Sequence, residues 1–541
     1  MTTSMSPLRD PAASSGRSGE QDVSTGPTGR SGPAGMPRGS GRTWPLAAVD
    51  GLLAGGLAIA VATFLGGAMS FVGISSGTPA PIAAIGGAFI DRTPAWLKSF
   101  AIATFGTHDK TALLAGMGIV LVLLCAGIGI LARRSLTLAL VGLAVIGAVG
   151  ALAVASRPNA GALDILPTAL GALAGIKLLQ TISQAIDRGD DKLSRRRVIA
   201  GAGALVVGFF GTRFDSGAGQ ATASRASTVL PKPTGPAPST AGAQLDVAGI
   251  SPYVVRNADF YRIDTAFVVP HLDAATWQLK VVGEVEQEIT LDWATLLTKP
   301  LMQKLVTLTC VSNEVGGNLI GNAVFTGWPV RELLAMAGPK AGADMVLSRS
   351  SDGFTAGTPI QAMTDDRDAL LAIAMNGEPL PFEHGFPVRL VVPGLYGYVS
   401  ATKWVTELKV TRFATDQGYW TPRGWSALGP VKTSSRVDVP SDGAQIKPGT
   451  TAVAGVAWAQ HRGIDQVEVK VDDGAWQPAK LAAEPTIDSW RQWVFTWEAT
   501  SGSHKISVRA TDATGAVQLS DPAPPDPDGA QGYHTITVRV A

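Results

Sequence analysis

The sequence predicts a multidomain protein in which a transmembrane α-helical region is followed by an α+β domain and then by a β-sandwich. A chain of 541 residues is too long for one compact domain, and its charged fraction of 16% is low for a fully soluble protein. The long apolar runs all lie before residue 215, whereas alternating apolar and polar residues dominate the last part of the chain. These three observations predict a membrane region that precedes two soluble domains.

Residues 1–43 are rich in Gly, Ser, Pro and Arg and carry almost no large apolar side chains. Such a segment cannot bury enough apolar surface to offset the entropy that it would lose on ordering. We therefore expect a disordered tail.

Residues 44–215 are predicted to be a helical membrane region. Four apolar runs each have close to the roughly 20 residues that a helix needs to cross the hydrocarbon core. The runs are nearly free of ionisable groups, with Asp164 as the exception, so an anchor packed through small residues is expected. A fifth and shorter run follows the arginines of "SRRRVIAGAGALVVGFFG". The four long runs are Trp44–Val72, Leu113–Leu131, Leu136–Ala155 and Ala162–Leu179.

Positive charges predict the orientation of this region. Clusters of Arg and Lys precede the first run, separate the second from the third and precede the fifth, so all of them fall on one side if the helices alternate. That side is expected to be cytoplasmic, which makes the chain a multi-pass protein of the cell membrane with its soluble domains outside the cytoplasm. The connection 75–111 then also lies outside, with "TPAWLKSFAIATFG" as an interfacial helix. The clusters are Arg30, Arg38 and Arg42; Arg133 and Arg134; and Lys192, Arg195, Arg196 and Arg197.

The fifth run also resembles a twin-arginine export signal, although Val198, Ile199 and Ala200 replace the usual Phe-Leu-Lys. Twin-arginine signals serve proteins that are exported already folded, often around a cofactor. The alternative is that these arginines only fix the topology. Residues 216–244 follow as a predicted flexible linker whose small residues could include a cleavage site.

The soluble part divides near residue 432. Residues 245–431 mix strand-like runs such as "TWQLKVVG" and "KLVTLTCV" with short helical runs such as "PVRELLAMAG", which predicts an α+β domain. Residues 432–541 are almost all strand-like, with turn signals such as "DDG" between alternating segments. This pattern predicts a β-sandwich of immunoglobulin type.

Cys310 is a candidate metal ligand. It is one of two cysteines, and the other, Cys125, lies inside an apolar run, so Cys310 has no obvious disulfide partner. Cys310 ends the strand-like "KLVTLTCV", on one face with Val306 and Leu308, and a glycine-rich loop follows. A thiolate at a strand end beside such a loop suits a soft metal, and an ordinary buried cysteine is the alternative.

A second group of candidates lies in "MNGEPLPFEHGFPVRLVVPGLYGYVSATKW". His384, Arg389 and Lys403 flank a buried strand and its turns, where three cationic donors could converge on a phosphate or another oxyanion. The alternative is that they are surface charges at the ends of a strand.

At these residues the sequence resembles the sulfite oxidase family of molybdopterin-dependent oxidoreductases. The resemblance covers about Asp246 to Ala541 and rests on "TLTCVSN", on "MNGEPLPFEHGFPVRLVVPG" and on the final sandwich, which looks like the family's dimerisation domain. It implies a molybdenum–molybdopterin cofactor and a homodimer. It also implies Cys310 as the metal ligand, Arg262 as the active-site arginine, and Asn313, His384, Arg389 and Lys403 as cofactor contacts, with Ser400 and Thr402 as weaker candidates.

Two departures from the family bear on the chemistry. Trp425 stands at the position where sulfite oxidases carry an active-site tyrosine, and an indole has an N–H donor but no hydroxyl, which puts sulfite as the substrate in doubt. Nothing resembles the family's cytochrome domain, and none of the six histidines lies inside the four long runs, so no haem is expected. Electrons are therefore expected to pass to or from a separate carrier, a cytochrome or a quinone.

The expected function is two-electron oxygen-atom transfer on a small oxyanion or oxo compound by a membrane-tethered, extracytoplasmic enzyme. One alternative is a reductase of a sulfoxide or N-oxide that runs the same centre in the opposite direction. Another is a non-catalytic receptor that binds an anion. A net charge of +1 without an aromatic-interleaved basic stripe argues against a nucleic-acid-binding protein.

Overall fold

The computed structural model describes residues 44–71, 74, 80–94, 97, 104, 109–157, 160–188, 197, 199, 201–204 and 216–541. The tail 1–43, most of the expected interfacial helix and most of the fifth apolar run lie outside the described residues.

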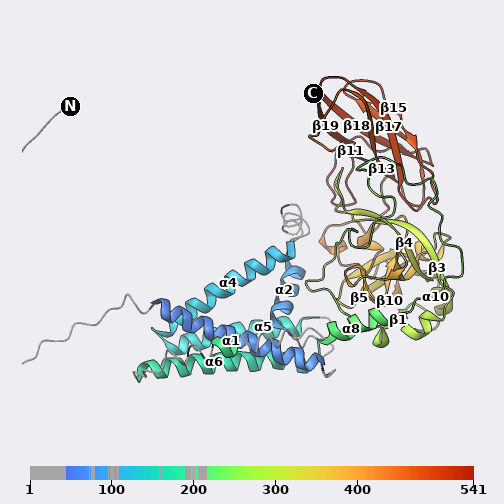
Figure 1. Ribbon diagram of the computed structural model, residues 1–541. Helices are drawn as coiled ribbons and strands as arrows, with labels where there is room; N and C mark the ends of the chain where they lie inside the picture. The colour runs from blue at the N-terminus through green and yellow to red at the C-terminus, as the bar shows by residue number, and fades with distance from the viewer. Residues whose placement is uncertain are drawn as a thin grey trace, which may run out of the picture. The chain divides into compact units, whose positions relative to one another are not determined.

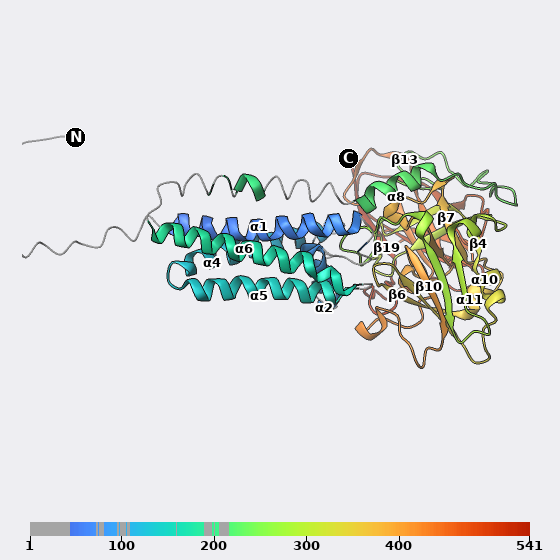
Figure 2. The ribbon, with the colours of Figure 1, turned by 90° about the horizontal axis from the view of Figure 1, so that it is seen from below.

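Four helices confirm the four apolar runs and are long and apolar enough to cross a membrane. They lie side by side in Figures 1 and 2 and contact one another through small residues. A Cβ atom on Gly51 of the first long helix would collide with the backbone of the second long helix at Cys125. A Cβ atom on Gly171 of the fourth would collide with Ala58 of the first. The helices are α1 (Trp44–Phe71), α4 (Asp109–Ala132), α5 (Leu136–Ala155) and α6 (Leu166–Asp187), with a 3-10 turn, η2 (Ala162–Ile165), leading into α6 and the shorter α2 (Pro81–Arg92) between α1 and α4.

A buried carboxylate near the start of α1 brings two of the positive clusters together. Asp50 is only 2% exposed. It accepts hydrogen bonds from Arg133 Nη2 at 2.7 Å and from Arg197 Nε and Nη2 at 2.6 and 2.7 Å. Arg133 and Arg197 therefore meet at one end of the helices, as the alternating topology requires. Because Asp50 is also ionisable, Asp164 is not the only ionisable residue in the apolar runs.

The segment 216–244, which was predicted to be a flexible linker, contains a helix and contacts the soluble part. Helix α8 (Ser216–Ser227) carries Arg225, which donates to Pro379 O and Leu380 O, both at 2.8 Å. Farther along, Thr234 N donates to Leu301 O at 2.7 Å. Backbone carbonyls of the soluble part thus accept hydrogen bonds from a segment whose composition predicted no such contacts.

The first soluble domain contains two sheets that share one apolar core. One sheet has the order β2-β1-β10-β5-β6, with β1 parallel to β10 and the other pairs antiparallel. The other has the order β3-β4-β7-β8, with β9 also paired to β7. The strands are β1 (Gln278–Gly283), β2 (Ile289–Asp292), β3 (Met302–Thr309), β4 (Ile320–Pro329), β5 (Met345–Ser350), β6 (Thr355–Pro359), β7 (Leu370–Met375), β8 (Glu378–Pro379), β9 (Arg389–Val391) and β10 (Val405–Thr411).

The helices of this domain are short, so the domain is richer in β structure than the α+β prediction implied. The α-helices are α9 (Trp293–Leu297), α10 (Val330–Ala337) and α11 (Ile360–Thr364), and the 3-10 turns are η3 (Ala274–Thr276), η4 (Phe382–His384), η5 (Gly397–Val399) and η6 (Thr421–Arg423).

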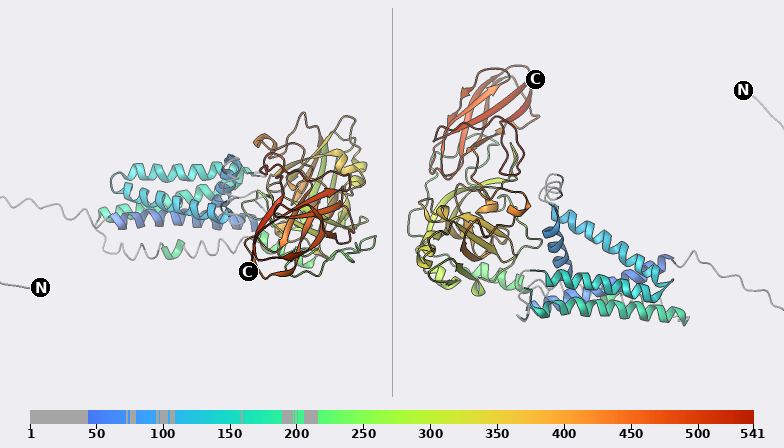
Figure 3. Two further views of the ribbon diagram at one scale, coloured as in Figure 1. Left: turned by 90° about the horizontal axis from the view of Figure 1, so that it is seen from above. Right: turned by 180° about the vertical axis from the view of Figure 1, so that it is seen from behind.

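The C-terminal strands, orange to red in Figure 3, form two further sheets around a separate core. Their orders are β11-β13-β17-β16 and β12-β19-β18-β14-β15. The prediction that this region is almost all strand is confirmed, while the immunoglobulin type stays a prediction. The strands are β11 (Ser434–Val439), β12 (Gln445–Ile446), β13 (Gly449–Trp458), β14 (Ile464–Val471), β15 (Gln477–Pro478), β16 (Lys480–Leu481), β17 (Arg491–Ala499), β18 (Gly502–Asp512) and β19 (His534–Val540).

Candidate functional site

Cys310 lies directly after strand β3, at the position where the chain leaves the sheet. Its backbone N donates to Leu319 O at 2.9 Å, so residues 311–318 form a loop that starts and ends at this pair. Cys310 is 9% exposed. The prediction that the cysteine ends a strand and precedes a loop is confirmed.

The loop 311–318 is held together by its own asparagine. Asn313 N donates to Cys310 O at 3.1 Å, and Asn313 Oδ1 accepts from Leu319 N at 2.8 Å. Two glycines in and beside this loop make room for aromatic rings. Gly316 has a positive φ of 78°, and a Cβ atom there would collide with the ring of His534, while a Cβ on Gly321 would lie 2.7 Å from the ring of Phe260.

Burial raises the pKa of the Cys310 thiol above its ordinary value, and hydrogen bonds from Ser312 and the charge of Lys403 offset only part of this effect. The thiol is therefore protonated at neutral pH. A soft metal ion that binds here would have to displace that proton.

His384 offers a buried acceptor. Its Nε2 lies 3.1 Å from Asn257 O, and because a carbonyl only accepts, the proton belongs on Nε2. His384 Nδ1 then carries a lone pair that has no partner among the described residues. Burial, reinforced by the charges of Lys403 and Arg389, lowers the pKa of His384 to about 3, which keeps the ring neutral.

Arg389 is a buried cation without a carboxylate partner among the residues that the structure describes. It is 4% exposed, donates from Nη1 to His384 O at 3.2 Å and lies 5.8 Å from the centre of the Phe325 ring. Burial lowers the pKa of Arg389 only to about 10, so the guanidinium remains charged. A buried charge of this kind favours an anionic ligand, because isolated ions are costly in a protein interior.

Tyr261 interacts electrostatically with both Cys310 and Arg389. Burial raises the pKa of Tyr261 strongly, and the charge of Cys310 raises it further while that of Arg389 lowers it. Its hydroxyl is therefore neutral and lies within electrostatic reach of both groups. Sequence reasoning missed Tyr261, although it directly precedes Arg262 in "DFYRIDTAFVVP".

Asp264 is a single carboxylate shared by two cations. Its Oδ2 lies 3.0 Å from Lys403 Nζ and 3.1 Å from Arg262 Nε. Lys403 also donates to Glu383 O at 2.8 Å. Burial lowers the pKa of Lys403 to about 8, with Asp264 opposing the shift. Asp264, which sequence reasoning also missed, holds Arg262 and Lys403 in one group.

The remaining predicted residues are placed less directly. Ser400 and Thr402 are fully buried and already have partners, since Ser400 Oγ donates to Tyr396 O at 2.9 Å and Thr402 Oγ1 lies 2.7 Å from Ser348 Oγ. Trp425 is half-buried and contacts the ring of Tyr398, with ring centres 5.8 Å apart. The structure thus brings Arg262, His384, Arg389 and Lys403 into one group, with Cys310 within electrostatic reach of Lys403. Asn313 lies in the loop after Cys310, and Trp425 belongs to an aromatic group with Tyr398 and Trp420.

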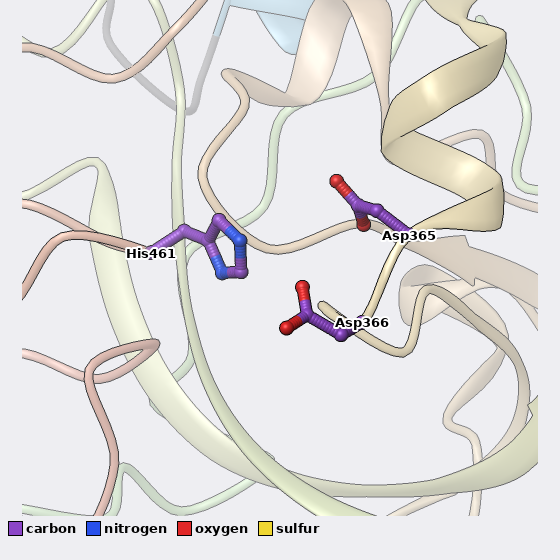
Figure 4. A group of neighbouring side chains, drawn as sticks. All are labelled: Asp365, Asp366 and His461. Atoms are coloured by element: carbon purple, nitrogen blue, oxygen red, sulfur yellow. The ribbon is translucent and has the colours of Figure 1, made fainter.

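A second polar group lies elsewhere in the soluble part. Figure 4 shows the imidazole of His461 directed toward Asp365 and Asp366, and the donor atoms of the three lie within 4.8 Å of one another. Arg367 Nε and Nη2 bond both oxygens of Asp365 at 2.8 to 2.9 Å, and His461 Nδ1 lies 3.1 Å from Asp488 Oδ1. These protein partners account for the group as an ionic network, so we assign it no ligand.

Comparisons with known proteins identify the domain that contains most of the first group. The family model of the oxidoreductase molybdopterin binding domain matches residues 266–420. The chain is 29% identical to mitochondrial sulfite oxidase of Mus musculus over 307 residues, which cover 47% of this chain and 56% of the mouse protein. It is 31% identical over 174 residues to the uncharacterized oxidoreductase YuiH of Bacillus subtilis, covering 31% of this chain and 84% of that protein.

The chain belongs to the sulfite oxidase-like family of molybdopterin oxidoreductases. It spans about half the length of the mammalian relatives that it matches. Among solved structures, the sulfane dehydrogenase SoxCD of Paracoccus pantotrophus is 22% identical, with a TM-score of 0.47, over 54% of this chain and 84% of that chain.

The chain therefore contains a molybdopterin-binding domain of the oxidoreductase type. The matched segment contains Cys310, His384, Arg389 and Lys403, whereas Arg262 and Trp425 lie outside it.

Proposed function

We propose that the protein is a membrane-tethered oxidoreductase that carries molybdenum–molybdopterin and transfers an oxygen atom to or from a small anionic or oxo substrate outside the cytoplasm. The observation that carries this proposal is a buried thiol, Cys310, within electrostatic reach of Lys403, which shares one carboxylate with Arg262. The neighbouring Arg389 is buried without a carboxylate partner among the described residues.

The described residues fit the cofactor chemically. Cys310 would supply a thiolate to the metal. Arg389 and Lys403 would bind the phosphate of the pterin, because buried cationic donors suit a dianion. His384 Nδ1 would accept a hydrogen bond from a pterin N–H, which would satisfy its unpartnered lone pair. Asn313, Ser400 and Thr402 would support this pocket mainly by holding its backbone.

When bound, the molybdenum centre supplies two-electron oxygen-atom transfer. In the oxidising direction, water provides the oxygen atom, and two protons and two electrons are released for each substrate oxidised. The protein's own residues bind and orient the substrate. Arg262, at the edge of the cationic group, would hold an oxyanion through its guanidinium, and Asp264 would fix the direction of that guanidinium.

The names of the mammalian relatives suggest a sulfite-like oxyanion as the substrate. Trp425, however, contacts Tyr398 and Trp420, with ring centres 5.8 and 5.9 Å away, and this aromatic group would narrow a pocket that a tyrosine would leave more open and polar. We therefore propose a small oxyanion or oxo compound other than sulfite. Electrons would pass singly to a separate cytochrome or quinone, without a haem in this chain.

The proposed division of labour follows the chain. The helices of residues 44–215 would tether the enzyme with its catalytic domain, residues 245–431, outside the cytoplasm. The strands of residues 432–541 would form an immunoglobulin-like dimerisation domain, which a dimeric mass of the purified full chain would support.

The proposal is tested by measuring molybdenum and pterin in the purified full-length protein and in its Cys310→Ser variant, with Cys125→Ser as the matched control. We expect both constituents in the wild type, turnover lost only in Cys310→Ser, and full activity in Cys125→Ser. Oxidation and reduction assays then separate an oxidase from a sulfoxide or N-oxide reductase. A folded wild-type protein from a molybdenum-replete host that contains neither metal nor pterin would support the anion receptor instead.

A further inference from the structure

We infer that the C-terminal sandwich positions the metal-ligand loop of the catalytic domain, and that Arg436 of strand β11 is the positioning residue. This inference rests on the proposed role of Cys310. It assigns the sandwich a task within one chain, in addition to the dimerisation expected of it.

The sandwich first holds the strand that leads to Cys310. Gln460 Nε2 donates to Thr309 Oγ1 at 2.8 Å and to Thr307 O at 3.1 Å. Thr307 in turn bonds residues 488 and 490, because its N donates to Asp488 O at 2.9 Å and its Oγ1 accepts from Trp490 N at 2.8 Å. The face of β3 that carries the threonines is therefore fastened to the sandwich up to the residue before the cysteine.

Arg436 holds the other side of Cys310. Its Nη1 donates to Gly317 O, inside the loop 311–318, at 2.6 Å. Its Nε and Nη2 bond Asp438 Oδ1 at 2.7 Å and Ser251 Oγ at 2.8 Å. Arg436 is 9% exposed, so these three directions are fixed in a buried environment. A planar guanidinium with every edge engaged defines the position of the carbonyl that it contacts.

His534 of strand β19 completes the contact. Its ring occupies the space where a side chain on Gly316 would lie, and its Nδ1 accepts from Val437 N at 3.0 Å, which ties the ring to the strand of Arg436. The loop that begins at Cys310 thus rests on two sandwich strands. Within the loop itself, the bonds of Asn313 and the bond from Gly317 N to Glu314 O add local restraints.

The consequence is that the orientation of the Cys310 side chain depends on the sandwich. Removing the guanidinium leaves Gly317 O without this donor and Asp438 without its cation, so the loop opens more often while the two domain cores persist. Arg436 would act through Cys310 and would touch neither the cofactor nor the substrate.

The test measures how fast a thiol reagent, iodoacetamide, modifies Cys310 in the full-length protein prepared without the cofactor, with peptide mass spectrometry to separate Cys310 from Cys125. Variants are Arg436→Met, Arg436→Lys and the matched control Arg491→Met. Arg491 also donates to two backbone carbonyls, Ala482 O at 2.8 Å and Ile464 O at 2.7 Å, but both lie within the sandwich.

We expect Arg436→Met to speed modification of Cys310 on the order of tenfold, Arg436→Lys to speed it less, and Arg491→Met to leave it at the wild-type rate. In the cofactor-loaded protein, the thiolate-to-molybdenum absorption per metal should change in Arg436→Met and not in Arg491→Met. An unchanged Cys310 rate in folded Arg436→Met, or an equal rise in Arg491→Met, overturns the inference. If Arg436→Met does not fold, a wild-type rate in Arg436→Lys overturns it.

The proposed function can fail separately. If Cys310 is not a metal ligand, the wild-type protein lacks the thiolate-to-molybdenum absorption while the differences in Cys310 modification remain.

Discussion

At the scale of single residues, the site is a neutral acceptor and a protonated thiol among buried cations. Sequence patterns made Cys310, His384, Arg389 and Lys403 candidates, but only the family resemblance gave them roles, because a core cysteine and surface charges explain the same patterns. Tyr261 and Asp264 could not be found in this way. Their roles come from side chains far apart in the sequence that meet only in the fold, such as Asp264 with Lys403.

The lowered pKa of His384 predicts a loss of stability in acid. The folded pKa is about 3 and the ordinary value is 6.5, so the unfolded chain binds the extra proton between these values. Stability is then fully present above pH 6.5 and falls as the pH drops toward 3, by up to about 1.4 kcal/mol per pH unit. Urea unfolding of the cofactor-free protein from pH 7 to pH 4 should show a steeper decline for the wild type than for His384→Gln, and parallel declines would contradict the assignment.

Replacing Trp425 is expected to change which substrate the enzyme oxidises. Trp425→Tyr restores a hydroxyl and reduces the bulk of the side chain beside Tyr398. We expect sulfite oxidation, measured as kcat/KM with an artificial electron acceptor, to rise at least about tenfold over a slow wild type, which corresponds to ~1.4 kcal/mol in the transition state. The control is Trp420→Tyr in the same aromatic group. Rapid sulfite turnover by the wild type would show that Trp425 does not decide the substrate.

At the scale of elements, the pattern of apolar residues was the informative signal. The four apolar runs became helices, and the alternating segments became strands. Helices α2 and α8 were not predicted. Helix α8 has a Gly- and Ser-rich sequence, and its attachment depends on Arg225 reaching two distant carbonyls. The glycines near Cys310 lie against the rings of Phe260 and His534, and the sequence pattern did not identify these neighbours.

The ion pairs of Asp50 are expected to stabilise the helical region. It accepts from both Arg133 and Arg197, so Asp50→Asn leaves two buried or half-buried cations without their carboxylate. Breaking a buried pair on one side costs about 3 kcal/mol or more. Thermal unfolding in detergent should therefore occur at a clearly lower temperature than in the wild type, whereas Asp187→Asn, at the exposed end of α6, should match the wild type. Equal melting of both variants would show that the cluster does not stabilise the helices.

At the scale of the whole molecule, the order of parts along the chain was predictable, but their joint task was not. Composition separated an apolar region from two soluble ones, since each has its own pattern. The bonds of Gln460 and Arg436 to the cysteine strand and loop join residues more than one hundred positions apart, which no local pattern encodes.

The orientation of the membrane region has its own test. Arg133 and Arg197 meet at Asp50, and positive clusters favour the cytoplasmic side. A reporter that is active only in the cytoplasm should work when fused after Arg134 and fail when fused after Thr234, with each fusion's level checked by immunoblot. Cytoplasmic activity of the Thr234 fusion would reverse the orientation.

The central claim is that Cys310 binds molybdenum, and X-ray absorption at the molybdenum edge tests it most directly. In the purified wild-type protein, the sulfur shell around the metal should contain the dithiolene sulfurs of the pterin and one additional thiolate. Cys310→Ser should keep the domain folded and lose that one sulfur, while Cys125→Ser should keep the full shell. An unchanged sulfur count in a folded, fully metallated Cys310→Ser variant would contradict the account.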